Sequence, residues 1–179
     1  MSNIATGIGR LWVSGYARSV VTTAKAHADC GTCKGVRNEL GAPGGVIYED
    51  RLWHLDHIVR PLPMAGWLIL KPKRHVESVA KLTDAESRAL GPLITRTAAA
   101  LERATGVKKV YVGLFGEAKL FAHVHVHLIP RPVELGDDLR GPLIFALMRA
   151  ESDRVPVSEA ERVSAAVRRA LARTRRRGG

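Results

Sequence analysis

Cysteine is scarce in this chain of 179 residues, because Cys30 and Cys33 are its only two. A single pair so close together cannot form the disulfide framework of a small secreted protein. Long apolar runs are also missing, since no stretch approaches the roughly 18 residues that a membrane span requires. Residues 1–25 have no charged start, long apolar centre or small-residue cleavage site, so we expect no secretory signal and a cytoplasmic location.

Acidic residues are outnumbered, with 17 aspartates and glutamates against 28 lysines and arginines and a formal net charge of +11. The surplus gathers in residues 158–179, where seven arginines accompany two glutamates. A basic balance favours anionic partners such as nucleotides, nucleic acid or an acidic membrane surface. No aromatic interleaving and no nucleic-acid motif accompany the arginines, so solubility alone explains this tail at least as well.

The length predicts one main domain with extensions. We expect a helical N-terminal extension over residues 1–29, the main domain over 30–150, and a basic C-terminal helix with an arginine tail over 151–179. Short apolar runs bounded by turn residues predict strands. They lie at 46–49, 52–58, 67–70, 109–115 and around 123–128.

Two helices are predicted from their capping signals. Thr83 and Glu86 form a capping box, and Gly106 is a typical helix end, so a helix crosses between the third and fourth strands. Pro92 lies inside it and predicts a kink or a restart. In the C-terminal region, Ser158 and Glu161 form a second capping box.

The helix that follows Ser158 is expected to run to about Arg173. It carries Val163, Val167 and Leu171 on one face, so it should dock on the domain or on a partner subunit. A further short helix is expected over 143–149. Together the elements predict an α+β fold, an antiparallel sheet of about five strands with a crossing helix and extra C-terminal helices.

The most informative segment is His123-Val-His125-Val-His127-Leu128. Histidine alternates with apolar residues at the period of a β-strand, which predicts three imidazoles on one face, roughly 6–7 Å apart. Imidazole titrates near neutrality and can act as base, acid, nucleophile or metal ligand. Any of the three histidines could attack a substrate, because spacing alone does not distinguish them.

This segment resembles the signature of the histidine-triad (HIT) superfamily of nucleotide hydrolases and transferases. Residues 66–75, which end in Lys-Pro-Lys-Arg-His75, look like that superfamily's strand and Pro-Lys-x-His turn. Residues 46–50 look like its opening strand, so the resemblance covers about residues 30–131. It implies that His125 is the nucleophile, that His127 contacts the phosphate or helps proton transfer to the leaving group, and that His123 supports them or binds a metal.

Cys30-Gly-Thr-Cys33 has the spacing of a metal-binding pair, since the short gap lets both thiolates face one ion. In zinc-containing branches of the superfamily, and in the related galactose-1-phosphate uridylyltransferases, two histidines complete the site. The resemblance places them at His75 and His123 and implies structural zinc. The alternatives are reduced cysteines without metal and, with less support, a redox pair.

Three positions depart from the family pattern. Lys119 stands where a phosphate-binding glutamine is common, and a lysine can hold phosphate only as a point charge. The acidic residue expected for the ribose is out of register, which leaves Asp56 for the ribose or Arg60 for a phosphate. Trp67 replaces a common histidine, as core packing or as a wall of the base pocket.

His54 and His57 also lie on a predicted strand. We expect ordinary strand-surface histidines here, with zinc ligation or a place in the nucleotide pocket as the less favoured alternatives.

The sequence therefore predicts a hydrolase or nucleotidyl transferase that acts on dinucleoside polyphosphates or nucleoside phosphoramidates. Homodimerisation is implied by the resemblance alone, and no metal is expected in the phosphoryl step. Three rivals remain: a nucleotide-binding regulatory protein with little turnover, a nucleic-acid-associated protein that uses the basic tail, and a metallohydrolase with a catalytic ion on the triad.

Overall fold

The structure is a computed structural model that describes residues 28–149 and 151–177, the last four of these by their backbone only. Nearly all of the helical N-terminal extension expected over residues 1–29 lies outside the described residues. No helix in the described part of the chain has the length and apolar character to cross a membrane.

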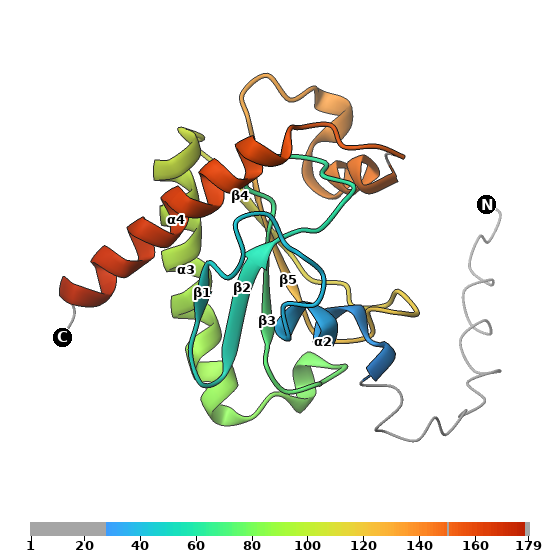
Figure 1. Cartoon of the computed structure of the whole chain (residues 1–179), viewed down its shortest axis with the longest axis vertical. Coiled ribbons are helices and arrows are strands. Elements are labelled where there is room, and N and C mark those ends of the chain that lie inside the picture. Colours follow the sequence, from blue (N-terminus) through green and yellow to red (C-terminus); the bar gives the residue numbers. More distant parts are fainter. Residues whose placement is uncertain (1–27, 150, 178–179) are drawn as a thin grey trace, which may run out of the picture.

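A five-stranded antiparallel sheet forms the centre of the protein (Figure 1). Its strands follow the spatial order β1-β2-β3-β5-β4. They are β1 (Tyr48–Glu49), β2 (Trp53–His57), β3 (Leu68–Pro72), β4 (Val110–Gly113) and β5 (Val126–Pro130). The predicted α+β class and strand number are confirmed, and the first two predicted strands pair antiparallel as β1 and β2.

Two long helices cover one face of the sheet, α3 (Asp84–Thr105) and α4 (Val157–Arg177). Alternate residues of the strands point toward them, as the period of two requires. The resulting core contains, among others, Trp53, Leu55, Leu68, Leu70, Val126, Leu128, Leu93, Leu101, Val163, Val167 and Leu171. The predicted docking of the C-terminal helix on the domain is therefore confirmed.

The opposite face carries shorter elements. They are α2 (Gly31–Val36) and the 3₁₀ helices η2 (Asp137–Leu139) and η3 (Gly141–Arg149), while the 3₁₀ helix η1 (Val79–Lys81) follows β3 and precedes α3 in the chain. A second, smaller apolar cluster lies here, where Trp67, Ile69 and Ile129 of the sheet side meet Ile144 and Leu147 of η3. This arrangement leaves the imidazoles of the histidine segment on the side of the short elements, while Val126 and Leu128 lie in the core under the two long helices.

The capping box of α3 is present as predicted, and Gly106 ends the helix with φ of 77°. The helix continues without a restart through Pro92, whose ring is exposed, so the lost hydrogen bond lies on the side that water reaches. The second capping box is not formed: α4 begins at Val157, because the amides of Glu159 and Ala160 already bond to the Pro156 carbonyl.

Glu86 is the buried carboxylate at the start of α3, and it allows a test of this junction. Its oxygens accept hydrogen bonds from Arg74 and from the Thr83 amide, and the Arg74 bond is the main cause of a lowered Glu86 pKa. The charged form therefore stabilises the fold above the ordinary pKa of 4.5, and this stability is lost as pH falls through the lower, folded-state pKa.

We expect Glu86→Gln to reduce the free energy of unfolding by about 1 to 2 kcal/mol at pH 7, because glutamine keeps the shape but loses the charge. The difference from the wild type should shrink below about pH 4.5. Urea unfolding between pH 3 and 8 measures it. Glu102→Gln, at an exposed site of the same helix, is the control; a pH-independent difference for Glu86→Gln would contradict the ion-pair explanation.

Candidate functional site

The histidine segment is less regular than its alternation predicts. β5 begins at Val126, so His127 lies on the strand while His123 and His125 precede it. The amide of Val124 bonds to the Val76 carbonyl, which ties this lead-in to the turn after β3. The prediction of three imidazoles in a row on one face of a regular strand is therefore wrong, since His123 precedes the strand and is directed into a separate cluster.

His125 is held by its own backbone neighbour. Its Nδ1 lies 2.7 Å from the His123 carbonyl oxygen, which can only accept, so Nδ1 carries a proton and donates. The neutral ring then keeps a free electron pair on Nε2. Burial is the main cause of a lowered His125 pKa, which favours this neutral form. A neutral imidazole with a bare Nε2 is suited to attack an electrophile.

His127 lies beside it, with the two ring centroids 4.9 Å apart. The indole Nε1 of Trp67 is 2.9 Å from His127 Nδ1, and both side chains are buried. Burial, and then the charge of His125, lower the His127 pKa to about 3. Trp67 is therefore a hydrogen-bond partner of His127 and not only core packing.

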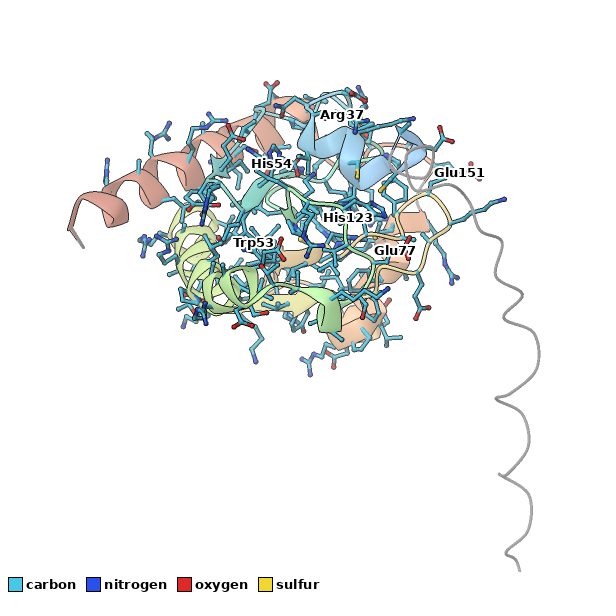
Figure 2. The ribbon with its side chains drawn as sticks, turned by 90° about the horizontal axis from the view of Figure 1, so that it is seen from below. Arg37, Trp53, His54, Glu77, His123 and Glu151 are labelled. Atoms are coloured by element: carbon cyan, nitrogen blue, oxygen red, sulfur yellow. The ribbon has the colours of Figure 1, made fainter. Side chains whose placement is uncertain are left out.

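Cys30, Cys33, His75 and His123 converge on one point, with their ligand atoms all within 4.8 Å of one another. The two cysteines flank the first turn of α2, one turn apart, so their thiols share a side. Cys33 Sγ lies 3.3 Å from His75 Nδ1 and 3.4 Å from His123 Nδ1. Figure 2 shows His123 within the body of the molecule, next to α2.

This cluster fits a tetrahedral zinc ion. Zinc bonds of about 2.3 Å to sulfur and 2.0–2.1 Å to nitrogen place neighbouring ligand atoms roughly 3.3–3.8 Å apart. The other ring nitrogen of His123 lies 3.1 Å from the Pro72 carbonyl and donates to it, which leaves Nδ1 free to ligate. The four residues that the sequence predicts as ligands are thus brought together.

Without a cation, the surroundings of the cluster favour the neutral thiol and the neutral imidazole. Burial, followed by the neighbouring Cys30 thiolate, raises the pKa of Cys33 to about 12, and burial lowers that of His123 to about 4. A bound dication reverses this balance for a thiol, because a coordinating thiol loses its proton.

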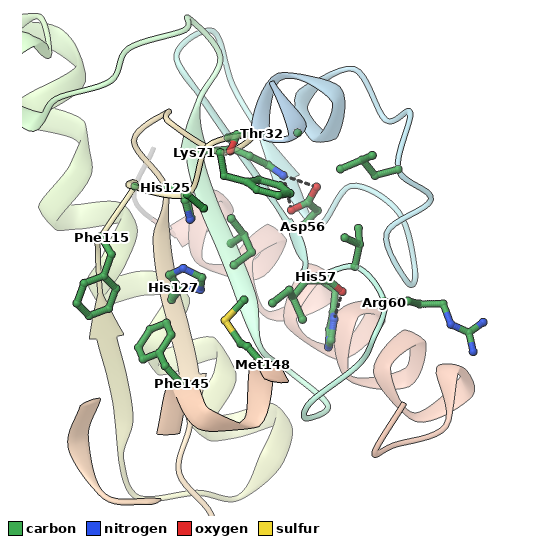
Figure 3. A pocket seen from close by; sticks show the side chains of 18 of the residues that line it. Thr32, Asp56, His57, Arg60, Lys71, Phe115, His125, His127, Phe145 and Met148 are labelled. Atoms are coloured by element: carbon green, nitrogen blue, oxygen red, sulfur yellow. Dashed lines mark hydrogen bonds and ion pairs between the residues drawn. The ribbon is translucent and has the colours of Figure 1, made fainter. Parts of the chain in front are cut away.

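A cavity of about 360 Å³ opens beside His125 and His127. Figure 3 shows the two imidazoles side by side, with Phe115, Phe145 and Met148 around them. The walls are mostly apolar and include Ile58, Ile69, Phe115, Phe145 and Met148. This size and character suit a small organic ligand with one flat apolar part.

Asp56 and Lys71 form a buried ion pair in the wall of this cavity. Both carboxylate oxygens lie 2.7 Å from the Lys71 ammonium, and the two residues are only 2% and 4% exposed. Asp56, which the sequence offered as a ligand of the ribose, is thus already paired with the Lys71 ammonium. Lys71 was not predicted from the sequence. Its place directly after the apolar run Trp67–Leu70 was a signal, because a lysine on a buried strand is rare unless a carboxylate pairs with it.

The other predicted phosphate ligands are not gathered around the cavity. Lys119 is exposed and does not line it, whereas its neighbours Glu117 and Ala118 do. Arg60 lies at the rim, but its guanidinium extends outward and pairs with Asp153, 93 residues away in the sequence (Figure 3).

His54 and His57 are fully buried, so their prediction as surface histidines is wrong. His54 Nε2 lies 3.3 Å from Asp56, next to the ion pair. His57 donates from Nδ1 to the Ile58 carbonyl and accepts the Gly66 amide at Nε2, which makes it a connector between β2 and the turn before β3. Neither belongs to the metal-type cluster.

The Asp56–Lys71 pair gives a prediction for stability. Lys71→Met leaves Asp56 buried without its cation, and we expect a loss of about 3–5 kcal/mol in the free energy of unfolding. The double variant Asp56→Leu/Lys71→Met removes both charges and should recover most of that loss. Urea unfolding of the singles and the double forms the test.

Lys73→Met is the matched control, because Lys73 makes an exposed pair with Glu49 at 3.3 Å and should change stability by less than about 1 kcal/mol. A double variant as unstable as Lys71→Met alone would show that the site cannot be filled by apolar side chains.

Comparison with known proteins agrees with this geometry. The model of the HIT domain family matches residues 40–133, more than half of the chain. No curated protein matches.

Solved structures are similar in fold. A zinc-bound histidine-triad family protein from Mycobacterium smegmatis has a TM-score of 0.61 at 21% identity, covering 84% of this chain and 99% of that one. A hypothetical histidine-triad nucleotide-binding protein from Sulfolobus tokodaii has 0.63 at 17% identity, covering 84% and 97%. A histidine-triad protein from Sinorhizobium meliloti has 0.54 at 26% identity, covering 73% and 90%. From the matched residues, the sheet and the histidine segment together, this chain belongs to the HIT domain family.

Proposed function

We propose that this protein is a nucleotide hydrolase or nucleotidyl transferase that reacts at the α-phosphate of a nucleotide conjugate. The observation that carries the proposal is the hydrogen bond from His125 Nδ1 to the His123 carbonyl, 2.7 Å long, beside the cavity. It leaves Nε2 of a neutral, half-buried imidazole with its electron pair. Family membership supports the same kind of chemistry.

The reaction has two displacements. His125 Nε2 attacks the α-phosphorus, a nitrogen–phosphorus bond forms, and the bond to the leaving group breaks with its electron pair going to the leaving atom. The oxygen of a water molecule then bonds to the phosphorus, and the nitrogen–phosphorus bond breaks with its electron pair returning to Nε2, which releases the nucleoside monophosphate. In a transferase, another acceptor takes the place of water and keeps the nucleotidyl group. His127 contacts the phosphate or helps proton transfer. The apolar walls of the cavity, which include Ile58 and Phe145, bind the base.

Dinucleoside polyphosphates and nucleoside phosphoramidates are the two substrate classes that we propose. Lys119 is exposed and Arg60 is paired with Asp153, so each would have to change partner or position to bind a phosphate. The cavity wall presents the Lys71–Asp56 pair in their place. A homodimer in the cytoplasm completes the proposal, and family membership is its only support.

For the Cys30–Cys33–His75–His123 cluster we propose structural zinc. The donor set and spacing support it, as does the zinc in the Mycobacterium smegmatis relative. Bound zinc would hold α2 and the turn after β3 to the segment that carries His125. The phosphoryl step itself needs no metal, because His125 supplies the nucleophile.

We expect the wild type to release AMP from diadenosine tetraphosphate or adenosine phosphoramidate, and His125→Ala to reduce the rate at least 10³-fold, since the attacking atom is gone. Chromatographic assay of AMP, with acid-quenched trapping of a labelled adduct, measures both. Zinc content and thermal unfolding of the variant verify that it is folded. Tight nucleotide binding by the wild type without any AMP release would favour a binding protein instead.

Cys33→Ser should lower the zinc content from one ion per chain to near zero and lower the melting temperature, because one of the two thiolates is lost. Elemental analysis and calorimetry measure these effects, and cobalt replacement should give thiolate-to-metal absorption in the wild type only. Glu77→Gln, which alters a residue 3.5 Å from the outer nitrogen of His75, is the control.

The same preparation separates structural from catalytic metal. With a chelator, activity should decline only as fast as the fold is lost. Immediate loss of activity in a protein that remains folded would instead support a metallohydrolase.

A further inference from the structure

Two of the histidines that line the cavity, His125 and His127, are hydrogen-bonded in opposite senses. His125 uses Nδ1 to donate to a carbonyl oxygen, at 2.7 Å. His127 uses Nδ1 to receive the indole N–H of Trp67, at 2.9 Å. The indole nitrogen can only donate, so the Nδ1 of His127 must present an electron pair.

The proton of the neutral His127 ring therefore sits on Nε2. To gain a second proton, the ring would have to break the bond to Trp67 and turn one N–H against another. The surroundings oppose this: Trp67 is fully buried, and the ring of Phe145 packs edge-on against both Trp67 and His127, with centroids 5.4 and 5.0 Å away. Burial acts in the same direction by lowering the His127 pKa.

We propose that Trp67 is a positioning residue that locks His127 as a neutral Nε2–H donor, so that His127 stabilises the leaving atom by a hydrogen bond and does not protonate it. This inference rests on the proposed function and narrows its substrate class.

The proton balance gives the reason. A neutral imidazole that handed over its Nε2 proton would become an anion, unless Nδ1 took up another proton at once, and the indole N–H of Trp67 is not acidic enough to supply one. The leaving group must therefore depart with its electron pair as a stable anion. When His125 forms its bond to the α-phosphorus, the bond that breaks should lead to a phosphate-type or phenol-type oxygen.

A site with a neutral His127 thus favours nucleoside polyphosphate leaving groups over amines. An amine departs only after gaining a proton, and a general acid contributes typically 10²–10⁴-fold to such a step. Dinucleoside polyphosphates fit a site without that acid, because a terminal phosphate group is stable as an anion at neutral pH.

The test uses adenosine 5′-aryl phosphates whose phenols span a range of acidity, together with adenosine 5′-alkylphosphoramidates. We expect kcat/KM of the wild type to fall steeply as the leaving group becomes more basic, with alkylphosphoramidates at least 10²-fold below the most acidic phenol. Trp67→Phe removes the donor, and Trp67→His supplies a ring that can also accept. In both variants, the ratio of kcat/KM between the most acidic and the most basic leaving group should be at least tenfold smaller than in the wild type, because His127 can then take a proton on Nδ1.

Trp53→Phe is the matched control. Trp53 is as fully buried as Trp67, but its indole nitrogen has no hydrogen-bond partner within the described part of the chain. Its loss should leave the steep dependence unchanged, even if the protein becomes less stable.

Nitrogen-15 NMR of the histidine rings reads the tautomer without any turnover. In the wild type at neutral pH, His127 should show a bare Nδ1 and a protonated Nε2, and in Trp67→Phe a mixture of both tautomers. A protonated Nδ1 in the wild type would overturn the inference, as would a flat leaving-group dependence or Trp67 variants with the wild-type slope. Absence of AMP release from every substrate would contradict the proposed function, while the NMR result would still decide the role of Trp67 on His127.

Discussion

His123 is the residue on which the arrangement of the site depends. Its Nδ1 belongs to the cluster with the two cysteines, its Nε2 donates to the Pro72 carbonyl, and its own carbonyl receives Nδ1 of His125. One residue therefore links the cysteine cluster, the end of β3 and the proposed nucleophile. Both ring nitrogens of this buried side chain have partners, which restricts the orientation of the backbone at His123. The carbonyl of His123 in turn orients the ring of His125.

The cavity combines apolar walls with a few polar groups that already have partners. Lys71 and Asp56 satisfy each other, His57 bridges two backbone groups, and His127 is bound by Trp67. Segments beyond the family match complete the enclosure, since Phe145 and Met148 of η3 line the cavity. Excluding water in this way strengthens each remaining electrostatic contact with a ligand.

Local patterns carried much of the prediction. The capping box of α3, its glycine end, the five strands and the four-residue metal-type cluster follow from short-range signals or from a family resemblance. Contacts between residues far apart in the sequence could not be predicted in this way. Arg60 pairs with Asp153, and His54 is buried beside an ion pair, because neighbouring strands and later segments provide environments that no local pattern records. The role of Trp67 was open for the same reason.

The sequence by itself determined that several histidines gather at one strand and that two cysteines face a common point, since alternation and short spacing restrict where side chains can lie. It could not distinguish the histidines from one another. Only the tertiary structure did so, by placing a carbonyl oxygen against Nδ1 of His125 and an indole N–H against Nδ1 of His127. An imidazole takes its tautomer from the partner that it meets, and those partners come together only when the chain is folded.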